Sequence, residues 1–129
     1  MESVVITGSA GLIGSHLCYK YLELGYRVIG IDSLIGGYIT NMPDNKNFFY
    51  YEQDILDTKE LSNVMGIYSP VLVIHCAALA HEGLSVFSPK KIVENIYAGT
   101  ASVCSASVSN KVPMFINTTS MARYGEGNP

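Results

Sequence analysis

The sequence predicts an α/β domain in which helices cover both faces of a doubly wound parallel sheet with strand order 3-2-1-4-5. Five short runs rich in β-branched and aromatic residues alternate with helical patterns, which is typical of consecutive βαβ units. A glycine-rich turn also joins the first run to the first helix, which is where such sheets bind phosphate groups. With 129 residues, 48% of them apolar and 15% charged, the chain is long enough for one domain with a core of its own.

Charge and cysteine content argue against several classes of function. The net charge is −3 and no Lys/Arg-rich run occurs, so we expect neither nucleic acid nor a membrane as a partner. The three cysteines are far apart and no histidine is paired with a ligand at metal-binding spacing, so we expect no disulfide framework and no metal site. The first strand begins close to Met1 and no apolar run has membrane length, so we expect a cytoplasmic protein.

The first βαβ unit is predicted over residues 4–32. An apolar strand over 4–6 is followed by apolar residues at helical spacing, which predict a helix over about 12–24. A second β-rich run covers 27–32. Strand, helix and strand of this length form a right-handed crossover, so the two strands should be parallel.

The turn inside this unit has the pattern Thr7-Gly8-x-x-Gly11-x-x-Gly14. Gly8 permits a tight turn, Gly11 permits close approach to a pyrophosphate, and Gly14 permits close contact between helix and strand. Asp32 ends the second strand 18 residues after Gly14, near the spacing expected for a carboxylate that binds ribose hydroxyls. The pattern favours a dinucleotide site over an ordinary glycine-rich turn.

The middle of the chain gives a loop, a strand and a short helix. Gly, Asn, Pro and Asp residues predict a loop over 33–46, and the third strand follows over 47–51. Asp54 comes just after that strand, at the edge where open α/β sheets bind ligands. We expect Thr58 to cap a short helix that ends near Gly66.

Continuous apolar residues over 71–75 predict a fourth strand that is covered on both faces. Cys76, Ala77 and Ala78 follow it. Their small side chains suit a backbone across which a cofactor lies, although small residues also permit tight packing alone.

A long helix is predicted over about 89–109, with Ser88 as its N-cap and Pro89 in its first turn. Helical spacing predicts that its buried side consists of Ile92, Val93, Ile96, Tyr97, Thr100, Val103, Cys104 and Val108. The fifth strand covers 114–117, and residues 118–120 leave it at the ligand edge.

Together these residues resemble the extended short-chain dehydrogenase/reductase family, in particular its NAD-dependent nucleotide-sugar epimerases and dehydratases, whose fold is Rossmann-like. The resemblance covers essentially the whole chain. Its motifs stand in order: the glycine turn, Asp32, Asp54-Ile55, His75-Cys76-Ala77-Ala78, Asn95 ahead of Gly99-Thr100, and Ser120-Met121-Ala122-Arg123-Tyr124-Gly125, which is similar to the family's Ser-x-x-Val-Tyr-Gly-like segment.

The resemblance implies an NAD-binding domain over residues 1–129. It implies that the pyrophosphate contacts Gly8, Gly11, Leu12, Ile13 and Gly14, that the adenosine ribose contacts Asp32 with Ser33 beside it, and that the adenine contacts Asp54 and Ile55. It also implies that the cofactor backbone contacts Cys76, Ala77 and Ala78 and that the nicotinamide contacts Thr118. Asn95 would lie at the active-site floor, unless it only packs within its helix. A carboxylate would repel a 2′-phosphate, and no Lys or Arg occurs between Asp32 and Lys46, so NAD is expected rather than NADP.

The same resemblance implies that Ser120 is a catalytic residue whose hydroxyl binds the substrate oxygen at the carbon that exchanges hydride. The family's base lies in a separate Tyr-x-x-x-Lys segment, and no tyrosine of this chain stands four residues before a lysine. We therefore expect a C-terminally truncated domain without the later strands and the nucleotide-sugar-binding part, which binds NAD but is inactive alone.

Two other functions fit the same residues: a stand-alone NAD(H)-binding or sensing module without catalysis, and a family member that acts on small carbonyl compounds. The expected truncation leaves the fifth strand as an exposed edge and one side of the long helix uncovered. We therefore expect marginal stability, or homo-oligomers that form through the helix or the strand.

Overall fold

Five parallel strands form the sheet, in the order β3-β2-β1-β4-β5 that the sequence predicts. The computed structural model describes residues 1–79, 86–125 and 127. The strands are β1 Ser3–Thr7, β2 Arg27–Asp32, β3 Phe48–Glu52, β4 Leu72–His75 and β5 Met114–Asn117. The predicted Rossmann-like fold is thereby confirmed.

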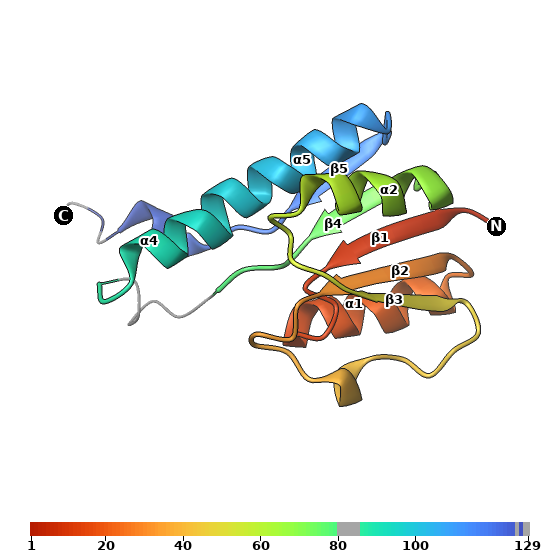
Figure 1. Ribbon diagram of the computed structural model, residues 1–129. Helices are drawn as coiled ribbons and strands as arrows, with labels where there is room; N and C mark the ends of the chain where they lie inside the picture. The colour runs from red at the N-terminus through yellow and green to blue at the C-terminus, as the bar shows by residue number, and fades with distance from the viewer. Residues whose placement is uncertain (80–85, 126, 128–129) are drawn as a thin grey trace.

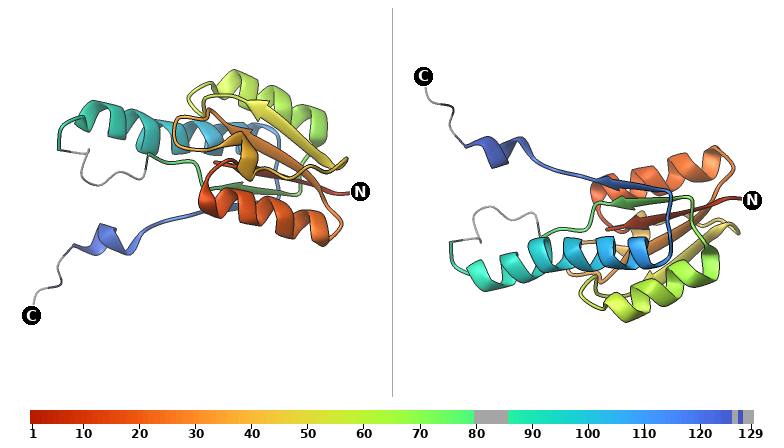
Figure 2. Two further views of the ribbon diagram at one scale, coloured as in Figure 1. Left: turned by 90° about the horizontal axis from the view of Figure 1, so that it is seen from below. Right: turned by 90° about the horizontal axis from the view of Figure 1, so that it is seen from above.

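Helices cover both faces of this sheet (Figure 1). α1 (Leu12–Glu23) lies on one face, and α2 (Thr58–Tyr68) and α5 (Gly99–Ser109) lie side by side on the other (Figure 2). Short 3-10 segments, η1 (Ile39–Asn41) and η3 (Met121–Tyr124), follow β2 and β5. The arrangement is a three-layer α/β/α sandwich.

The carboxyl ends of the strands meet at one edge because all neighbours are parallel. Thr7 of β1 pairs with Ile31 of β2 and with His75 of β4, and His75 pairs in turn with Asn117 of β5. The strand order reverses between β1 and β4, since β2 and β3 extend to the other side of β1. Open α/β sheets bind ligands at such a switch point.

Two apolar clusters, one on each face, hold the layers together. Successive strand residues point to opposite faces, so Val4 and Ile6 join one cluster and Val5 joins the other. Beneath α1 lie Val4, Ile6, Cys18, Val28, Leu72 and Ile74. Beneath α2 and α5 lie Val5, Ile29, Ile31, Ile55, Leu61, Val64, Met65, Val73, Val103 and Ala106. Each fully buried aliphatic side chain stabilises the fold by about 1.5–3 kcal/mol.

The cap of α2 differs from the predicted one. Asp57 is the N-cap, and its carboxylate accepts a hydrogen bond from a backbone N–H of the first turn at 3.1 Å. Thr58 instead bonds across to α5, with its Oγ1 2.6 Å from the Oγ of Ser102. The helix also continues past Gly66 to Tyr68. Both residues are good N-caps, and the sequence alone did not rank them.

The long helix spans the predicted residues but is built from three segments. α4 (Pro89–Ile92) leads into a π-helical segment, η2 (Val93–Ala98), and then into α5. Ser88 stands at the N-cap position, without a side-chain capping hydrogen bond. In Figure 1 the α4 end extends beyond the carboxyl ends of the strands.

Half of the predicted buried side of this helix is wrong: Val103 is buried and Ile92, Thr100 and Cys104 are half-buried, but the other four residues are exposed. Val93, Ile96, Tyr97 and Val108 are exposed, whereas α5 buries Gly99, Ser102, Val103, Ala106 and Ser107. A Cβ on Gly99 would lie only 2.4 Å from the Cδ1 of Ile55. The helix therefore lies too close to its neighbours for large side chains, and small residues form its buried side.

β5 is an edge strand, as predicted. Its Met114 and Ile116 are 57% and 43% exposed, and its outer side pairs with no other strand within the described ranges. Among those same residues, no helix is long and apolar enough to cross a membrane.

Candidate functional site

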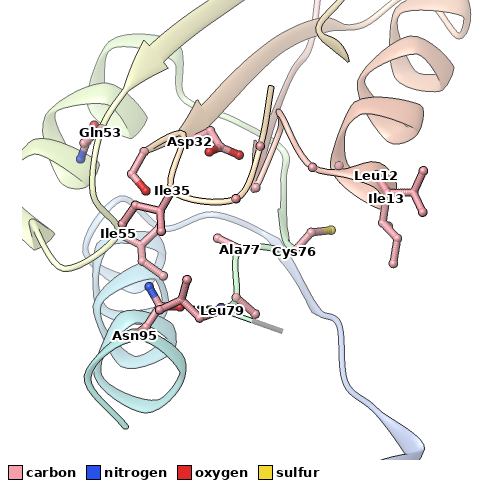
Figure 3. Close-up of a pocket in the computed structure, with 17 residues that line it drawn as sticks. Leu12, Ile13, Asp32, Ile35, Gln53, Ile55, Cys76, Ala77, Leu79 and Asn95 are labelled. Carbon is pink, nitrogen blue, oxygen red and sulfur yellow. Dashed lines mark hydrogen bonds between the residues drawn. The ribbon is translucent and has the colours of Figure 1, made fainter. Parts of the chain in front are cut away.

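A pocket of about 320 Å³ lies at the carboxyl edge of the sheet (Figure 3). The glycine turn, the loop after β2, the residues after β3, the segment after β4 and the π-helical segment η2 enclose it. Most of the predicted cofactor-binding residues line it: Gly8, Gly11, Leu12, Ile13, Gly14, Asp32, Ser33, Ile55, Cys76, Ala77, Ala78 and Asn95. The strand topology thus brings residues that are up to 87 positions apart (Gly8 to Asn95) into one site.

The glycine turn packs so closely that two of its positions have no room for a side chain. Gly8 has a φ of +71°, and a Cβ there would lie 2.8 Å from the backbone nitrogen of Ala77. A Cβ on Gly14 would lie 2.0 Å from the carbonyl oxygen of Gly8. The turn therefore holds the start of α1 against the end of β1 and beside the segment that follows β4.

α1 begins without a side-chain cap, because its N-cap residue is Gly11 and its first turn holds no acidic residue. The first backbone N–H groups of a helix have no intrahelical partner. Here those groups belong to Leu12, Ile13 and Gly14, which line the pocket. Together with the positive end of the helix dipole they favour an anion at this end of the pocket.

The carboxylate of Asp32 is held by two backbone N–H groups. Its Oδ2 accepts a hydrogen bond from Ala10 at 2.9 Å, and its Oδ1 accepts one from Leu34 at 2.8 Å. Ala10 lies in the glycine turn, and its carbonyl oxygen accepts hydrogen bonds from Tyr38 N at 3.1 Å and Asn41 Nδ2 at 2.8 Å. A carboxylate has about four acceptor positions, so Asp32 keeps acceptor capacity for hydroxyl groups in the pocket.

The segment after β4 forms the wall opposite Asp32. The backbone N–H of Leu79 donates to the Oδ1 of Asn95 at 2.8 Å, which ties this segment to η2. Burial raises the pKa of the Cys76 thiol, and a side-chain hydrogen bond with Thr118 opposes the shift. The thiol is therefore protonated at neutral pH and adds no charge to the pocket.

His75, at the end of β4, is 2% exposed and bonded on both ring nitrogens. Its Nδ1 lies 2.6 Å from the Oγ1 of Thr7, and its Nε2 lies 3.0 Å from the Oγ1 of Thr100. Burial lowers the pKa of His75 to about 4, so the ring is neutral at neutral pH.

Three predicted site residues do not line the pocket. Asp54 is exposed, and its Oδ1 accepts a hydrogen bond from the backbone of Leu56 at 2.9 Å, which closes a turn. Thr118 donates to the carbonyl oxygen of His75 from both its backbone nitrogen and its Oγ1, at 3.1 and 3.0 Å. Ser120 is exposed and follows β5.

Five residues outside the predicted set also line the pocket: Ile35, Gly36, Gly37, Gln53 and Leu79. A Cβ on Gly37 would lie 2.5 Å from the Cβ of Ala10, so the loop after β2 packs directly on the glycine turn. The adjacent glycines were the available signal for this close approach. Nothing in the residue type of Gln53 marks it as a pocket residue. It lies beside the pocket only because β3 ends at the residue before it.

Comparison with known proteins places these features in a family. A family model described as the NAD dependent epimerase/dehydratase family matches residues 4–129. A UDP-glucose 4-epimerase of Rhizobium leguminosarum bv. trifolii is 32% identical over 128 residues, which cover 96% of this chain and 37% of that protein. The chain thus spans little more than a third of this relative.

Solved structures show the same likeness in three dimensions. UDP-glucose 4-epimerase of Thermotoga maritima, determined with UDP-glucose, has a TM-score of 0.92 at 33% identity and covers 98% of this chain and 41% of its own. UDP-glucose 4-epimerase of Brucella ovis, in complex with NAD, has a TM-score of 0.93 at 34% identity. The match covers 100% of this chain and 39% of the Brucella ovis chain.

Proposed function

The chain belongs to the NAD dependent epimerase/dehydratase family, and on that premise we propose that it forms the NAD-binding part of a nucleotide-sugar epimerase or dehydratase. The similar proteins support this substrate class, since they are UDP-glucose 4-epimerases and one was determined with UDP-glucose. NAD in the Brucella ovis structure supports the cofactor. Because the chain spans little more than a third of these proteins, the activity of a whole enzyme is part of the proposal.

The observation that supports NAD most directly is the position of Asp32 beside the glycine turn. One pocket presents uncapped helix N–H groups to a pyrophosphate and a fixed carboxylate to ribose hydroxyls. No lysine or arginine is among the described residues that line it, so nothing there would neutralise a 2′-phosphate beside Asp32. The residues present therefore fit NAD better than NADP.

We propose which wall of the pocket would meet each part of the cofactor. Gly8, Gly11 and Gly14, with the N–H groups of Leu12 and Ile13, would hold the pyrophosphate. Asp32 and Ser33 would meet the adenosine ribose. Ile35, Gln53 and Ile55 would enclose the adenine, and the exposed Asp54 stays a predicted adenine contact. The other half of the cofactor would lie along Cys76, Ala77 and Ala78, with Asn95 at the floor and Thr118 behind it.

The chemistry that NAD would supply in this pocket is reversible hydride transfer at a sugar carbon. For this chemistry the chain itself supplies orientation: the Asp32 side of the pocket holds one end of the cofactor, and the segment after β4 shapes the other. Ser120 would hydrogen-bond the substrate oxygen at the reacting carbon. No Tyr-x-x-x-Lys segment is present to take up the hydroxyl proton. We therefore propose that the 129-residue chain binds NAD and has no turnover by itself.

Calorimetric titration of the chain with NAD and NADP tests the cofactor. Saturable NAD binding that exceeds NADP binding is the expected result, and equal binding of the two would contradict the role of Asp32. An assay of the same sample with UDP-glucose and NAD tests the chemistry. Detectable epimerisation would contradict the inactivity that we infer from the missing base.

A further inference from the structure

We propose that His75 is a positioning residue that sets the nicotinamide half of the cofactor site through a chain of hydrogen bonds running in one direction. The proposal rests on the proposed NAD-binding function. His75 is buried beneath the pocket and does not line it. It would act on the cofactor only by fixing the segment after β4, and that segment lines the pocket.

The direction of the chain follows from its last member. The Oγ1 of Thr100 donates its single proton to the carbonyl oxygen of Ile96, at 2.6 Å, because a carbonyl can only accept. The Nε2 of His75 must then carry the proton that it shares with Thr100. A neutral imidazole has one proton, so Nδ1 is an acceptor, and the hydroxyl of Thr7 donates to it.

The first member of the chain lies in the pocket wall. The hydroxyl oxygen of Thr7 accepts a hydrogen bond from the backbone N–H of Ala77 at 3.2 Å. Protons are thus donated in sequence from Ala77 to Thr7, His75, Thr100 and Ile96, and every donor has its acceptor. The other tautomer of His75 would leave Nε2 and Thr100 as two acceptors facing each other.

The chain joins the elements that surround one half of the pocket. It runs from the end of β1 through the end of β4 to the junction of η2 and α5. The carbonyl oxygen of His75 also accepts both hydrogen bonds from Thr118, after β5. A second tie between the same segments, from Leu79 to Asn95, lies beside the first. Rotation of the His75 ring would therefore remove one of the two ties between η2 and the segment that carries Ala77, and leave only the bond from Leu79 to Asn95.

Apart from Thr7, which begins the glycine turn, these contacts lie on one side of that turn. The adenosine side consists of Asp32, the loop after β2 and the end of β3, none of which bonds to His75 among the described contacts. The pyrophosphate would lie at the turn itself, so the cofactor's second half would lie along the segment after β4. Disruption of the chain should therefore weaken binding of NAD and spare binding of ADP, which contains only the adenosine diphosphate half.

Thr100→Val is the main test, because it keeps the shape of the side chain and leaves the buried Nε2–H without an acceptor. We expect affinity for NAD to fall about tenfold and affinity for ADP to change less than about twofold. Thr58→Val is the matched control, since it removes a threonine hydroxyl that also bonds to α5 but lies away from the pocket. It should leave the ratio of NAD to ADP affinity unchanged.

Nitrogen-15 spectra of the His75 ring give a readout that needs no ligand. In the wild-type chain they should show a protonated Nε2 and a bare Nδ1, and in Thr100→Val a mixture of tautomers. His75→Gln keeps a donor near the position of Nε2 but has no acceptor at the position of Nδ1, so it should also lower the ratio of NAD to ADP affinity. If His75→Gln does not fold, Thr100→Val still tests the positioning role of His75.

Equal losses of NAD and ADP affinity in Thr100→Val, or none, would overturn the positioning role while leaving the proposed function intact. A wild-type ring protonated on Nδ1 would do the same. Failure of the wild-type chain to bind either ligand would instead overturn the proposed function and this inference with it.

Discussion

A Cβ on Gly14, in the first turn of α1, would lie 2.0 Å from the carbonyl oxygen of Gly8 at the end of β1. No rotamer change relieves that contact, because both partners are backbone. Gly14→Ala should therefore destabilise the fold by about 3 kcal/mol and abolish detectable NAD binding. Urea unfolding and calorimetric titration measure the two effects.

Gly66→Ala is the matched substitution in α2. Its Cβ would lie 3.4 Å from the Oδ1 of Asn110, an ordinary contact, and Gly66 stands in the interior of the helix. Replacing a helical glycine by alanine stabilises by about 0.5–1 kcal/mol. The two changes should thus shift unfolding in opposite directions, and a stabilised Gly14→Ala variant would contradict the geometry of the turn.

Asp32→Ala should lower NAD affinity by about 10- to 100-fold, since hydrogen bonds to a charged group contribute about 1.5–3 kcal/mol. The preference for NAD over NADP should shrink or vanish at the same time, because the repulsion of a 2′-phosphate is lost. Glu52→Ala is the control: this exposed carboxylate pairs in register with Asp32 but does not line the pocket. Unchanged cofactor preference in Asp32→Ala would contradict the assignment.

Stability should fall in mild acid because of His75. The pKa of its ring is about 4 in the folded chain and about 6.5 when unfolded, so the unfolded state binds the proton more readily. The contribution of the neutral ring is complete above about pH 6.5 and is lost as pH falls toward 4, by at most about 3 kcal/mol. Urea unfolding from pH 7 to 4.5 should show this decline, and His75→Gln should show a shallower one. An equal dependence of the unfolding free energy on pH in both chains would contradict the role of His75 in this decline.

The exposed edge of β5 should cause self-association. Ile116 presents an apolar side chain on a strand whose outer hydrogen-bonding side is unpaired within the described residues. A charged residue on an edge strand opposes pairing with another sheet. Ile116→Lys should shift sedimentation toward monomer, whereas Thr40→Lys in η1 adds the same charge elsewhere and should not. Identical oligomer distributions in all three chains would rule out β5 as the contact.

The sequence was sufficient for the strand order and for most of the pocket. Apolar runs of strand length marked all five strands, and the glycine spacing together with Asp32 located the centre of the site. These signals are local, so they can be read without knowing which elements pack together. Asp54 does not line the pocket, and its carboxylate accepts a hydrogen bond from the backbone of Leu56, so its predicted contact with the adenine stays a prediction.

The long helix was harder to read because its buried side is not its apolar side. Close packing against Ile55 and α2 selects the small residues Gly99, Ser102 and Ala106, while Tyr97 and Val108 are exposed. Helical periodicity finds large apolar residues and has no means of recognising a stripe of small ones. The hydrogen bonds of His75 could not be predicted from the sequence, because their partners Thr7 and Thr100 lie 68 and 25 positions away and only the fold brings them together.

The central place of β1 in the sheet has a consequence for synthesis on the ribosome. β1 is made first, yet its partner β4 ends only at residue 75. At roughly 5–20 residues per second, about 3–15 s pass before β4 has been made. Until then β1 can pair only with β2, which in turn pairs with β3, and one side of the central strand stays open. The wall of the cofactor pocket that follows β4 is therefore synthesised only after the glycine turn and Asp32.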